Sequence, residues 1–187
     1  MRILAVVATL VALALPAGAV EMGDDGLHKP DWLRTTFKDM REDLAEANAE
    51  GKRLMVIFEQ RGCIYCTKMH EEVFPDPDVE KVIRDNFFVV QMNLFGDEEV
   101  TDFDGTVMAE KDMAVRWGVV FTPTMIFLPE SVDDGQTAAQ AAVVTMPGAF
   151  GKWTTFNLFN WVLEKGYDGE EHFQKYHARK FAEQSKG

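Results

Sequence analysis

Short apolar runs along the chain alternate with stretches in which apolar residues recur every three or four positions. The runs at residues 54–58, 87–94 and 125–128 predict strands that are buried on both faces. A further strand is expected at residues 142–146, before Pro147-Gly148. The three- and four-residue spacing predicts amphipathic helices. We expect these helices at residues 31–51, 63–73, 78–84, 110–117, 153–166 and 173–181.

Strands that alternate with helices and close with a hairpin indicate an α/β fold. We expect a mixed sheet of about four strands, flanked by helices, in a domain over residues 31–166. An extra helix forms a C-terminal extension over residues 167–187. Residues 20–30 are mixed and polar and end at Pro30, so we predict a flexible lead-in there.

The first nineteen residues follow a different pattern. Arg2 precedes an unbroken apolar run over residues 3–15, Pro16 ends the run, and the small residues 17–19 follow. This is the three-part layout of a secretory signal peptide, and the run is shorter than the roughly 20 residues that a spanning helix needs. We therefore expect cleavage near Ala19 and a soluble protein that is exported, to the periplasm for example.

Charge narrows the classes of partner. The chain of 187 residues has 19 Lys and Arg against 31 Asp and Glu, a formal net charge of −12. Such a balance argues against nucleic acid and anionic membrane surfaces as partners. An acidic cluster over residues 97–104 is read as a solvated hairpin rather than a calcium loop, because it lacks the loop's closing Glu. We expect a monomer with no bound cofactor and no metal.

The only two cysteines, Cys63 and Cys66, are separated by two residues. A disulfide that closes so short a loop constrains the unfolded chain little, so reactivity explains the pair better than stability. At the start of a helix this spacing gives Cα atoms within the roughly 4.4–6.8 Å that a disulfide needs. Unpaired N–H groups at the helix N-terminus stabilise a thiolate on Cys63, while Cys66 lies one turn inward. We predict that Cys63 attacks a substrate disulfide and that Cys66 resolves the intermediate.

A second motif, Thr122-Pro123, comes directly before the strand at residues 125–128. Together with the strand–CxxC–helix unit and residues 117–119, it resembles the thioredoxin superfamily over residues 31–163. The resemblance implies that Pro123 is cis and packs against the disulfide, and that the backbone of Thr122 binds the substrate chain. We also expect Ile64 and Tyr65, between the cysteines, to contact substrate.

A narrower resemblance, to the SoxW-type periplasmic thioredoxins, rests on Phe58-Glu59, residues 62–66, Met69-His70 and the signal peptide. It implies a reductant of exported protein disulfides that is recharged by a membrane electron carrier of the CcdA or DsbD type. Sulfur oxidation and cytochrome c maturation are the implied pathways.

One departure from thioredoxin concerns proton handling. Ile57 stands where thioredoxin has a buried Asp, so another group must handle protons. Glu59 is the candidate for this proton handling. The alternative is that Glu59 is an exposed carboxylate with only a structural role.

Three other functions stay open at this stage. Tyr65 resembles the Cys-x-Tyr-Cys of disulfide isomerases and glutaredoxins, which leaves an oxidase or isomerase as an alternative. A copper metallochaperone would use Cys63, Cys66 and His70 as ligands, although a solvent-facing histidine is the simpler reading of His70. A thioredoxin-like binding module without redox activity is the third.

Overall fold

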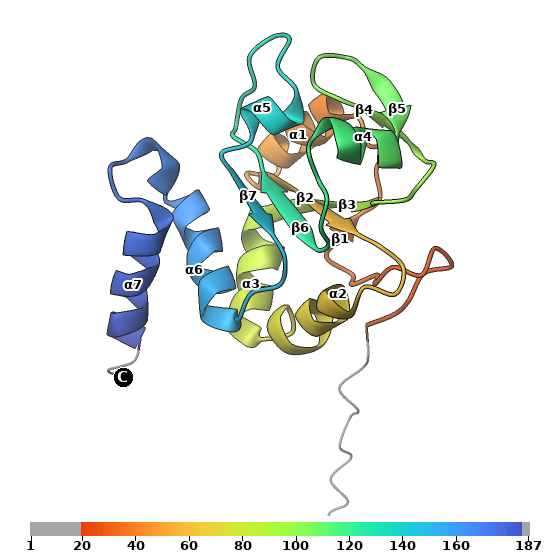
Figure 1. Ribbon diagram of the computed structural model, residues 1–187. Helices are drawn as coiled ribbons and strands as arrows, with labels where there is room; N and C mark the ends of the chain where they lie inside the picture. Colours follow the sequence, from red (N-terminus) through yellow and green to blue (C-terminus); the bar gives the residue numbers. More distant parts are fainter. Residues whose placement is uncertain (1–19, 185–187) are drawn as a thin grey trace, which may run out of the picture.

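The computed structural model describes residues 20–184 (Figure 1). The expected signal peptide, residues 1–19, lies outside the described residues, and so do residues 185–187. Among the residues described, no helix has both the length and the apolar character needed to cross a membrane.

The central sheet has five strands in the order β1-β3-β2-β6-β7. Strands β1, β3 and β2 are parallel. Strand β6 runs antiparallel to β2, and β7 runs antiparallel to β6 and so in the same direction as β2. Val56 at the centre of β2 lies opposite Val90 of β3 and Ile126 of β6. The strands are β1 Leu33–Arg34, β2 Arg53–Glu59, β3 Phe87–Asn93, β6 Thr124–Phe127 and β7 Val144–Pro147. The α/β fold with a mixed sheet is confirmed, with five strands rather than about four.

Two hydrophobic cores lie on the two faces of this sheet, because alternate residues of β2 point to opposite sides. Met55 and Ile57 belong to the core that contains Met69, Val73 and Phe159, and Val56 and Phe58 belong to the other. In Figure 1, α1, α4 and α5 lie above the sheet and α2 and α3 below it. The helices that cover the sheet are α1 Met40–Ala49, α2 Ile64–Lys68, the π-helical turn η1 Met69–Val73, α3 Pro77–Asn86, α4 Glu110–Arg116, α5 Ala138–Ala141 and α6 Lys152–Leu163.

The first helix begins later than the sequence pattern predicted. Asp39 caps α1 by accepting hydrogen bonds from the backbone N–H groups of Arg41 and Glu42. Leu33 lies instead in β1, opposite Val89, and Phe37 is 94% exposed. The expected start at Asp31 was therefore wrong, because pairing with β3 takes up the backbone of residues 33–34.

Residues 20–30, expected to form a flexible lead-in, lie against the domain. Leu27 and His28 are buried, and the backbone carbonyl of His28 accepts a hydrogen bond from Gln91 of β3. Arg61 donates to the backbone carbonyls of Asp24 and Asp25. The segment thus joins the loop after β2 to the sheet.

The hairpin expected at the acidic residues 97–104 is present, formed by β4 Glu99–Thr101 and β5 Val107–Ala109. One of its acidic residues is not solvated, however. Asp102 is fully buried and accepts hydrogen bonds from Trp117 Nε1 and from the backbone N–H groups of Phe103 and Ala138. It ties the hairpin to α4 and to the start of α5.

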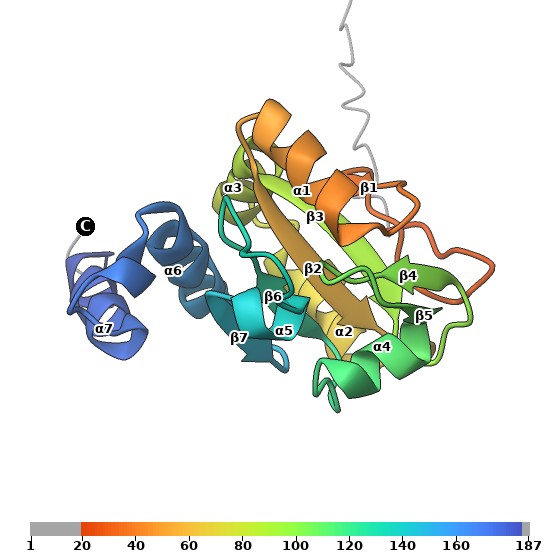
Figure 2. The ribbon, with the colours of Figure 1, turned by 90° about the horizontal axis from the view of Figure 1, so that it is seen from above.

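At the C-terminal end, η2 Gly166–Asp168 leads into α7 Phe173–Gln184. Trp161 of α6 packs edge-on against Tyr167 and Phe173. In both ribbon views α7 lies on the outer side of α6, away from the sheet (Figures 1 and 2).

Candidate active site

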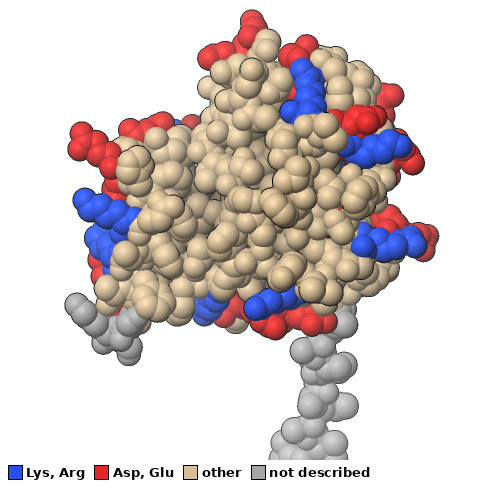
Figure 3. All heavy atoms as spheres, viewed as in Figure 1, with Lys and Arg blue, Asp and Glu red and all other residues tan. Residues whose placement is uncertain are grey.

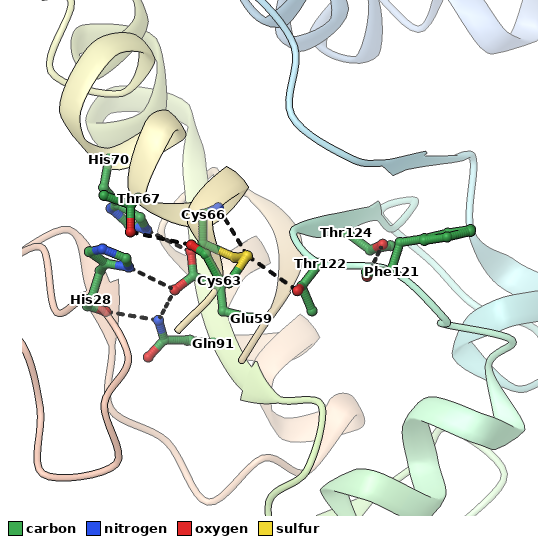
Figure 4. Close-up of a disulfide and its surroundings, with 10 residues drawn as sticks. All are labelled: His28, Glu59, Cys63, Cys66, Thr67, His70, Gln91, Phe121, Thr122 and Thr124. Atoms are coloured by element: carbon green, nitrogen blue, oxygen red, sulfur yellow. Dashed lines mark hydrogen bonds and ion pairs between the residues drawn. A yellow bond between two sulfur atoms is a disulfide. The ribbon is translucent and has the colours of Figure 1, made fainter. Parts of the chain in front are cut away.

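Cys63 and Cys66 form a disulfide at the N-terminus of α2, with Cα atoms 5.2 Å apart (Figure 4). Cys63 is the N-cap residue, and its Sγ accepts a hydrogen bond from the backbone N–H of Cys66 over 3.0 Å. The two residues differ slightly in access, since Cys63 is 7% exposed and Cys66 is fully buried. This is the asymmetry expected of an attacking and a resolving thiol.

The chain reaches this position through a tight turn after β2. Gly62 has a φ of +73°, in the left-handed region that favours glycine, and it directs the chain from the strand into α2. Five residues of α-helix continue into η1, where Phe74 N–H donates to Met69 O. Wide turns of this π type are frequent at functional sites.

The segment before β6 lies across from the disulfide. The Thr122–Pro123 peptide bond is cis, and Pro123 O accepts a hydrogen bond from Gly148 N–H after β7. Thr122 Oγ1 donates to Cys63 Sγ over 3.2 Å, so the structure brings these two residues together through a side chain. Figure 4 shows Thr122 directed at the sulfur and Phe121 directed away from it.

Apolar side chains are exposed on both sides of the disulfide. Ile64 and Tyr65, between the cysteines, are 74% and 59% exposed. Val120 and Phe121, just before Thr122, are also exposed. Large apolar side chains are usually buried, so their exposure beside the disulfide favours contact with a binding partner.

Behind the disulfide lies a buried polar network. Glu59, the last residue of β2, is fully buried, and its Oε1 lies 2.6 Å from His70 Nε2. Its Oε2 accepts a hydrogen bond from Gln91 over 3.0 Å and lies 3.6 Å from His28 Nδ1. Burial by itself raises the pKa of the Glu59 carboxyl, but the hydrogen bonds from His28 and His70 outweigh it and hold the pKa below its ordinary value.

Two of the readings made from the sequence are therefore wrong. His70 is 2% exposed rather than solvent-facing, and Glu59 is not an exposed carboxylate. His28 and Gln91 were missed altogether. No spacing in the sequence could have found them, because His28 precedes the domain and Gln91 lies inside a strand.

His28, Glu59 and His70 could together bind a metal ion, because one potential ligand atom of each lies within 4.8 Å of the others. The rings of His28 and His70 are stacked, with centroids 4.3 Å apart and 14° between their planes. An ion bound by imidazole lies in the plane of the ring, and two stacked, nearly parallel planes meet only far outside the cluster. The arrangement fits hydrogen bonding rather than a shared ion. The copper hypothesis gains no support either, since His70 Nε2 contacts Glu59.

The sheet topology and the disulfide between two cysteines at a helix N-terminus define the class: a thiol–disulfide oxidoreductase with a thioredoxin-like α/β fold. A family model described as a thioredoxin-like domain matches residues 40–144, so the chain belongs to the thioredoxin-like family.

Solved structures agree on the fold. A thioredoxin-fold protein from Helicobacter pylori is 13% identical, with a TM-score of 0.59 over 81% of this chain and 89% of that chain. A thioredoxin from Thermus thermophilus is 26% identical, with a TM-score of 0.53 over 68% of this chain and 86% of that chain. No curated protein sequence matched the chain.

Proposed function

We propose that this protein is an exported reductant of disulfides in other exported proteins. The Cys63 thiolate attacks a substrate disulfide, forms a mixed disulfide and releases one substrate thiolate. Cys66 then attacks Cys63 Sγ, and the second substrate thiolate leaves. The protein dithiol is oxidised to the Cys63–Cys66 disulfide, and the substrate takes up two electrons and two protons.

The observation that carries this proposal is the asymmetry of the disulfide. Cys63 is the more accessible of the two cysteines, and its Sγ accepts hydrogen bonds from Cys66 N–H and Thr122 Oγ1. Hydrogen bonds that stabilise a thiolate lower the pKa of the thiol and raise the thiolate fraction near neutral pH. Cys66 is fully buried, so it does not meet the substrate disulfide directly. It attacks the Sγ of Cys63 once Cys63 has bonded to the substrate sulfur.

Substrate contacts are assigned to Ile64, Tyr65, Thr122 and Pro123. Ile64 and Tyr65 offer exposed apolar surface beside Cys63, and the Thr122–Pro123 segment lies on the opposite side of the sulfur. Figure 3 shows that charged side chains lie mainly around the margins of the face seen in Figure 1. An extended, weakly charged protein segment around a disulfide suits such a surface.

The cellular setting rests on the sequence. The signal-peptide pattern before Val20 favours export to the periplasm, with cleavage near Ala19. The resemblance to SoxW-type thioredoxins favours a membrane electron donor of the CcdA or DsbD type and a role in sulfur oxidation or cytochrome c maturation. We propose that the protein acts as a monomer and needs no cofactor besides its own disulfide.

Insulin reduction with dithiothreitol as the electron source tests the chemistry. The wild-type chain is expected to accelerate it, and Cys63→Ser is expected to remove the acceleration. Cys66→Ser should accumulate a mixed disulfide that is visible on a non-reducing gel. Unchanged activity in Cys63→Ser would refute the role of Cys63.

The direction of electron flow needs a separate measurement, because thioredoxin-fold potentials span from about −270 mV to about −120 mV. Equilibrium titration of the Cys63–Cys66 pair against glutathione should give a value toward the thioredoxin end. A potential near the upper limit would reject the reductant and favour the oxidase or isomerase.

A further inference from the structure

A buried carboxylate and imidazole lie directly behind the disulfide (Figure 4). Glu59 ends β2, and His70 lies in η1, the continuation of the helix that carries both cysteines. Oε1 of Glu59 and Nε2 of His70 are 2.6 Å apart, and both side chains are almost completely inaccessible to solvent. The pair therefore joins the end of the central strand to the redox-active helix.

The protonation of this pair follows from its contacts. The pKa of Glu59 is held below its ordinary value, so the carboxylate is ionised and Nε2 of His70 carries the proton that it donates. The other nitrogen, His70 Nδ1, then has a free lone pair. It is buried and has no hydrogen-bond partner among the residues described. An imidazole nitrogen of this kind is a base, and the carboxylate stabilises the imidazolium that forms when it takes a proton.

Cys66, earlier in the same helix, must give up a proton before it attacks. Cys66 and His70 are four residues apart, so they lie on the same face of the helix, and both are buried. Burial disfavours the thiolate, so Cys66 needs a base in order to attack. Ile57, two residues before Glu59 on the same face of β2, is apolar and provides none.

We infer that His70, oriented by Glu59, is the general base for Cys66 in the resolving step. This inference rests on the proposed function and adds a residue to it. Nδ1 of His70 takes the proton from Cys66 Sγ as that sulfur bonds to Cys63 Sγ, and the bond from Cys63 to the substrate sulfur breaks. The substrate leaves as a thiolate, and the proton on His70 passes to that thiolate or to water. In the reverse direction, His70 returns the proton to Cys66 when the disulfide is reduced.

Several other charged or titratable groups surround His70 beyond its contact with Glu59. His28 stacks on its ring and approaches the second oxygen of Glu59. Lys29 donates to Gln91, which in turn donates to Glu59. The charged neighbours of His70 along the helix are Lys68, Glu71 and Glu72. Lys68 and Glu72 form an ion pair with each other on the helix surface. His70 and Trp32 help to line a cavity of about 390 Å³. Its wall also includes the charged residues Glu21, Lys29, Asp31, Glu80 and Arg84. Among the titratable side chains that the structure describes, Glu59 and His28 contact the His70 ring directly, and the aromatic rings of Trp32 and Phe74 also pack against it.

The two thiols can be followed separately with 5,5′-dithiobis(2-nitrobenzoate), a chromogenic disulfide. Attack by Cys63 releases one thionitrobenzoate and leaves the other on Cys63. Attack by Cys66 releases the second, so stopped-flow absorbance of the reduced protein records two phases. The first phase reports Cys63, and the second reports the step in which His70 takes the proton.

His70→Asn should slow the second phase at neutral pH by about 100-fold, within the range typical of a lost general base. Its second-phase rate should then rise in proportion to hydroxide, because no fixed base takes the proton from Cys66. Glu59→Gln keeps a hydrogen-bonding group and removes the charge, and it should slow the same phase to a smaller extent. The matched control is His172→Asn, at an exposed histidine next to α7, which should give both phases of the wild type.

Circular dichroism and thermal melting establish that each variant is folded. If His70→Asn does not fold, Glu59→Gln decides the question in the same way. A second phase with the rate and pH profile of the wild type in the folded variant would overturn the role of His70 and leave the proposed function intact. A wild-type protein that never shows the second release would instead refute the proposed function.

Discussion

Thr122 Oγ1 donates a hydrogen bond to Cys63 Sγ over 3.2 Å, although the two residues are 59 positions apart in the chain. The contact joins the start of β6 to the start of α2. It gives the Cys63 sulfur a second donor in addition to the N–H of Cys66. A thiolate on Cys63 gains more from both donors than a thiol does, so the side chain of Thr122 takes part in setting the reactivity of Cys63.

Thr122→Val removes this hydroxyl and keeps the shape of the side chain. A hydrogen bond to a charged group contributes about 1.5–3 kcal/mol, so the pKa of the Cys63 thiol should rise by about one unit or more. Alkylation with iodoacetamide as a function of pH, in a Cys66→Ser background, measures it. Thr145→Val, at an exposed position of β7, is the control and should leave the pKa unchanged. An unshifted pKa in Thr122→Val would show that the hydroxyl does not act on the thiolate.

Asp102→Asn tests the buried carboxylate beneath the β4–β5 hairpin. One oxygen of Asp102 accepts from the N–H groups of Phe103 and Ala138, and the other accepts from Trp117 Nε1 and lies 3.3 Å from Arg116. In Asn one of the two oxygens is replaced by an NH2 group, which faces N–H donors and cannot accept from them. We therefore expect a loss on the order of 3 kcal/mol in the free energy of unfolding. Urea denaturation measures the loss. Asp97→Asn breaks only an exposed ion pair with Lys111 and should cost less than about 1 kcal/mol.

The parts of the fold that the sequence predicted are those whose signal is local. The apolar runs in β2, β3 and β6 are long enough to identify buried strands. The two cysteines and the Thr122-Pro123 motif identified the functional region by residue type and spacing alone. The helix after Cys63 was also predicted, because its apolar positions recur at helical intervals.

The parts that were missed depend on tertiary contacts. β1 has only two residues, too few for any periodicity, and it exists because Leu33 and Arg34 pair with β3. His70 occupies an ordinary helical position, and its burial follows from Glu59 at the end of β2 and His28 from a segment outside the predicted domain. Asp102 shared an acidic stretch with solvated neighbours, and only the approach of α4 and α5 makes it buried.

Asp43 of α1 should make stability depend on pH. Burial raises the pKa of its carboxyl to about 7, with further contributions from the charges of Asp39, Glu46 and Glu42. The folded state therefore holds the proton more tightly than the unfolded chain, whose Asp pKa is about 3.9. The stability that this group contributes is complete below about pH 4 and is lost as the pH rises through about 7.

Asp43→Asn removes this titration and keeps an acceptor for Thr36 Oγ1. Its melting temperature should therefore exceed that of the wild type at pH values above the pKa, and the difference should shrink as the pH falls. Thermal melting across a pH series gives the comparison. Asp134→Asn, at an exposed turn, should follow the wild-type curve. Parallel curves for wild type and Asp43→Asn would mean that Asp43 is not protonated in the folded state.

Gly62→Ala tests the turn that presents Cys63. The φ of +73° at Gly62 costs an L-residue roughly 1–2 kcal/mol, and a Cβ built there meets no atom within 4 Å. The cost is therefore conformational rather than steric, and we expect a loss of about 1 kcal/mol in the free energy of unfolding. Because the same turn positions the N-cap of α2, disulfide reduction should also slow. Gly169→Ala is the matched control, since its φ is −99° and an added Cβ there makes only an ordinary contact, 3.6 Å from Gly166 O, so little loss is expected. Equal losses in the two variants would contradict the role of the left-handed conformation at Gly62.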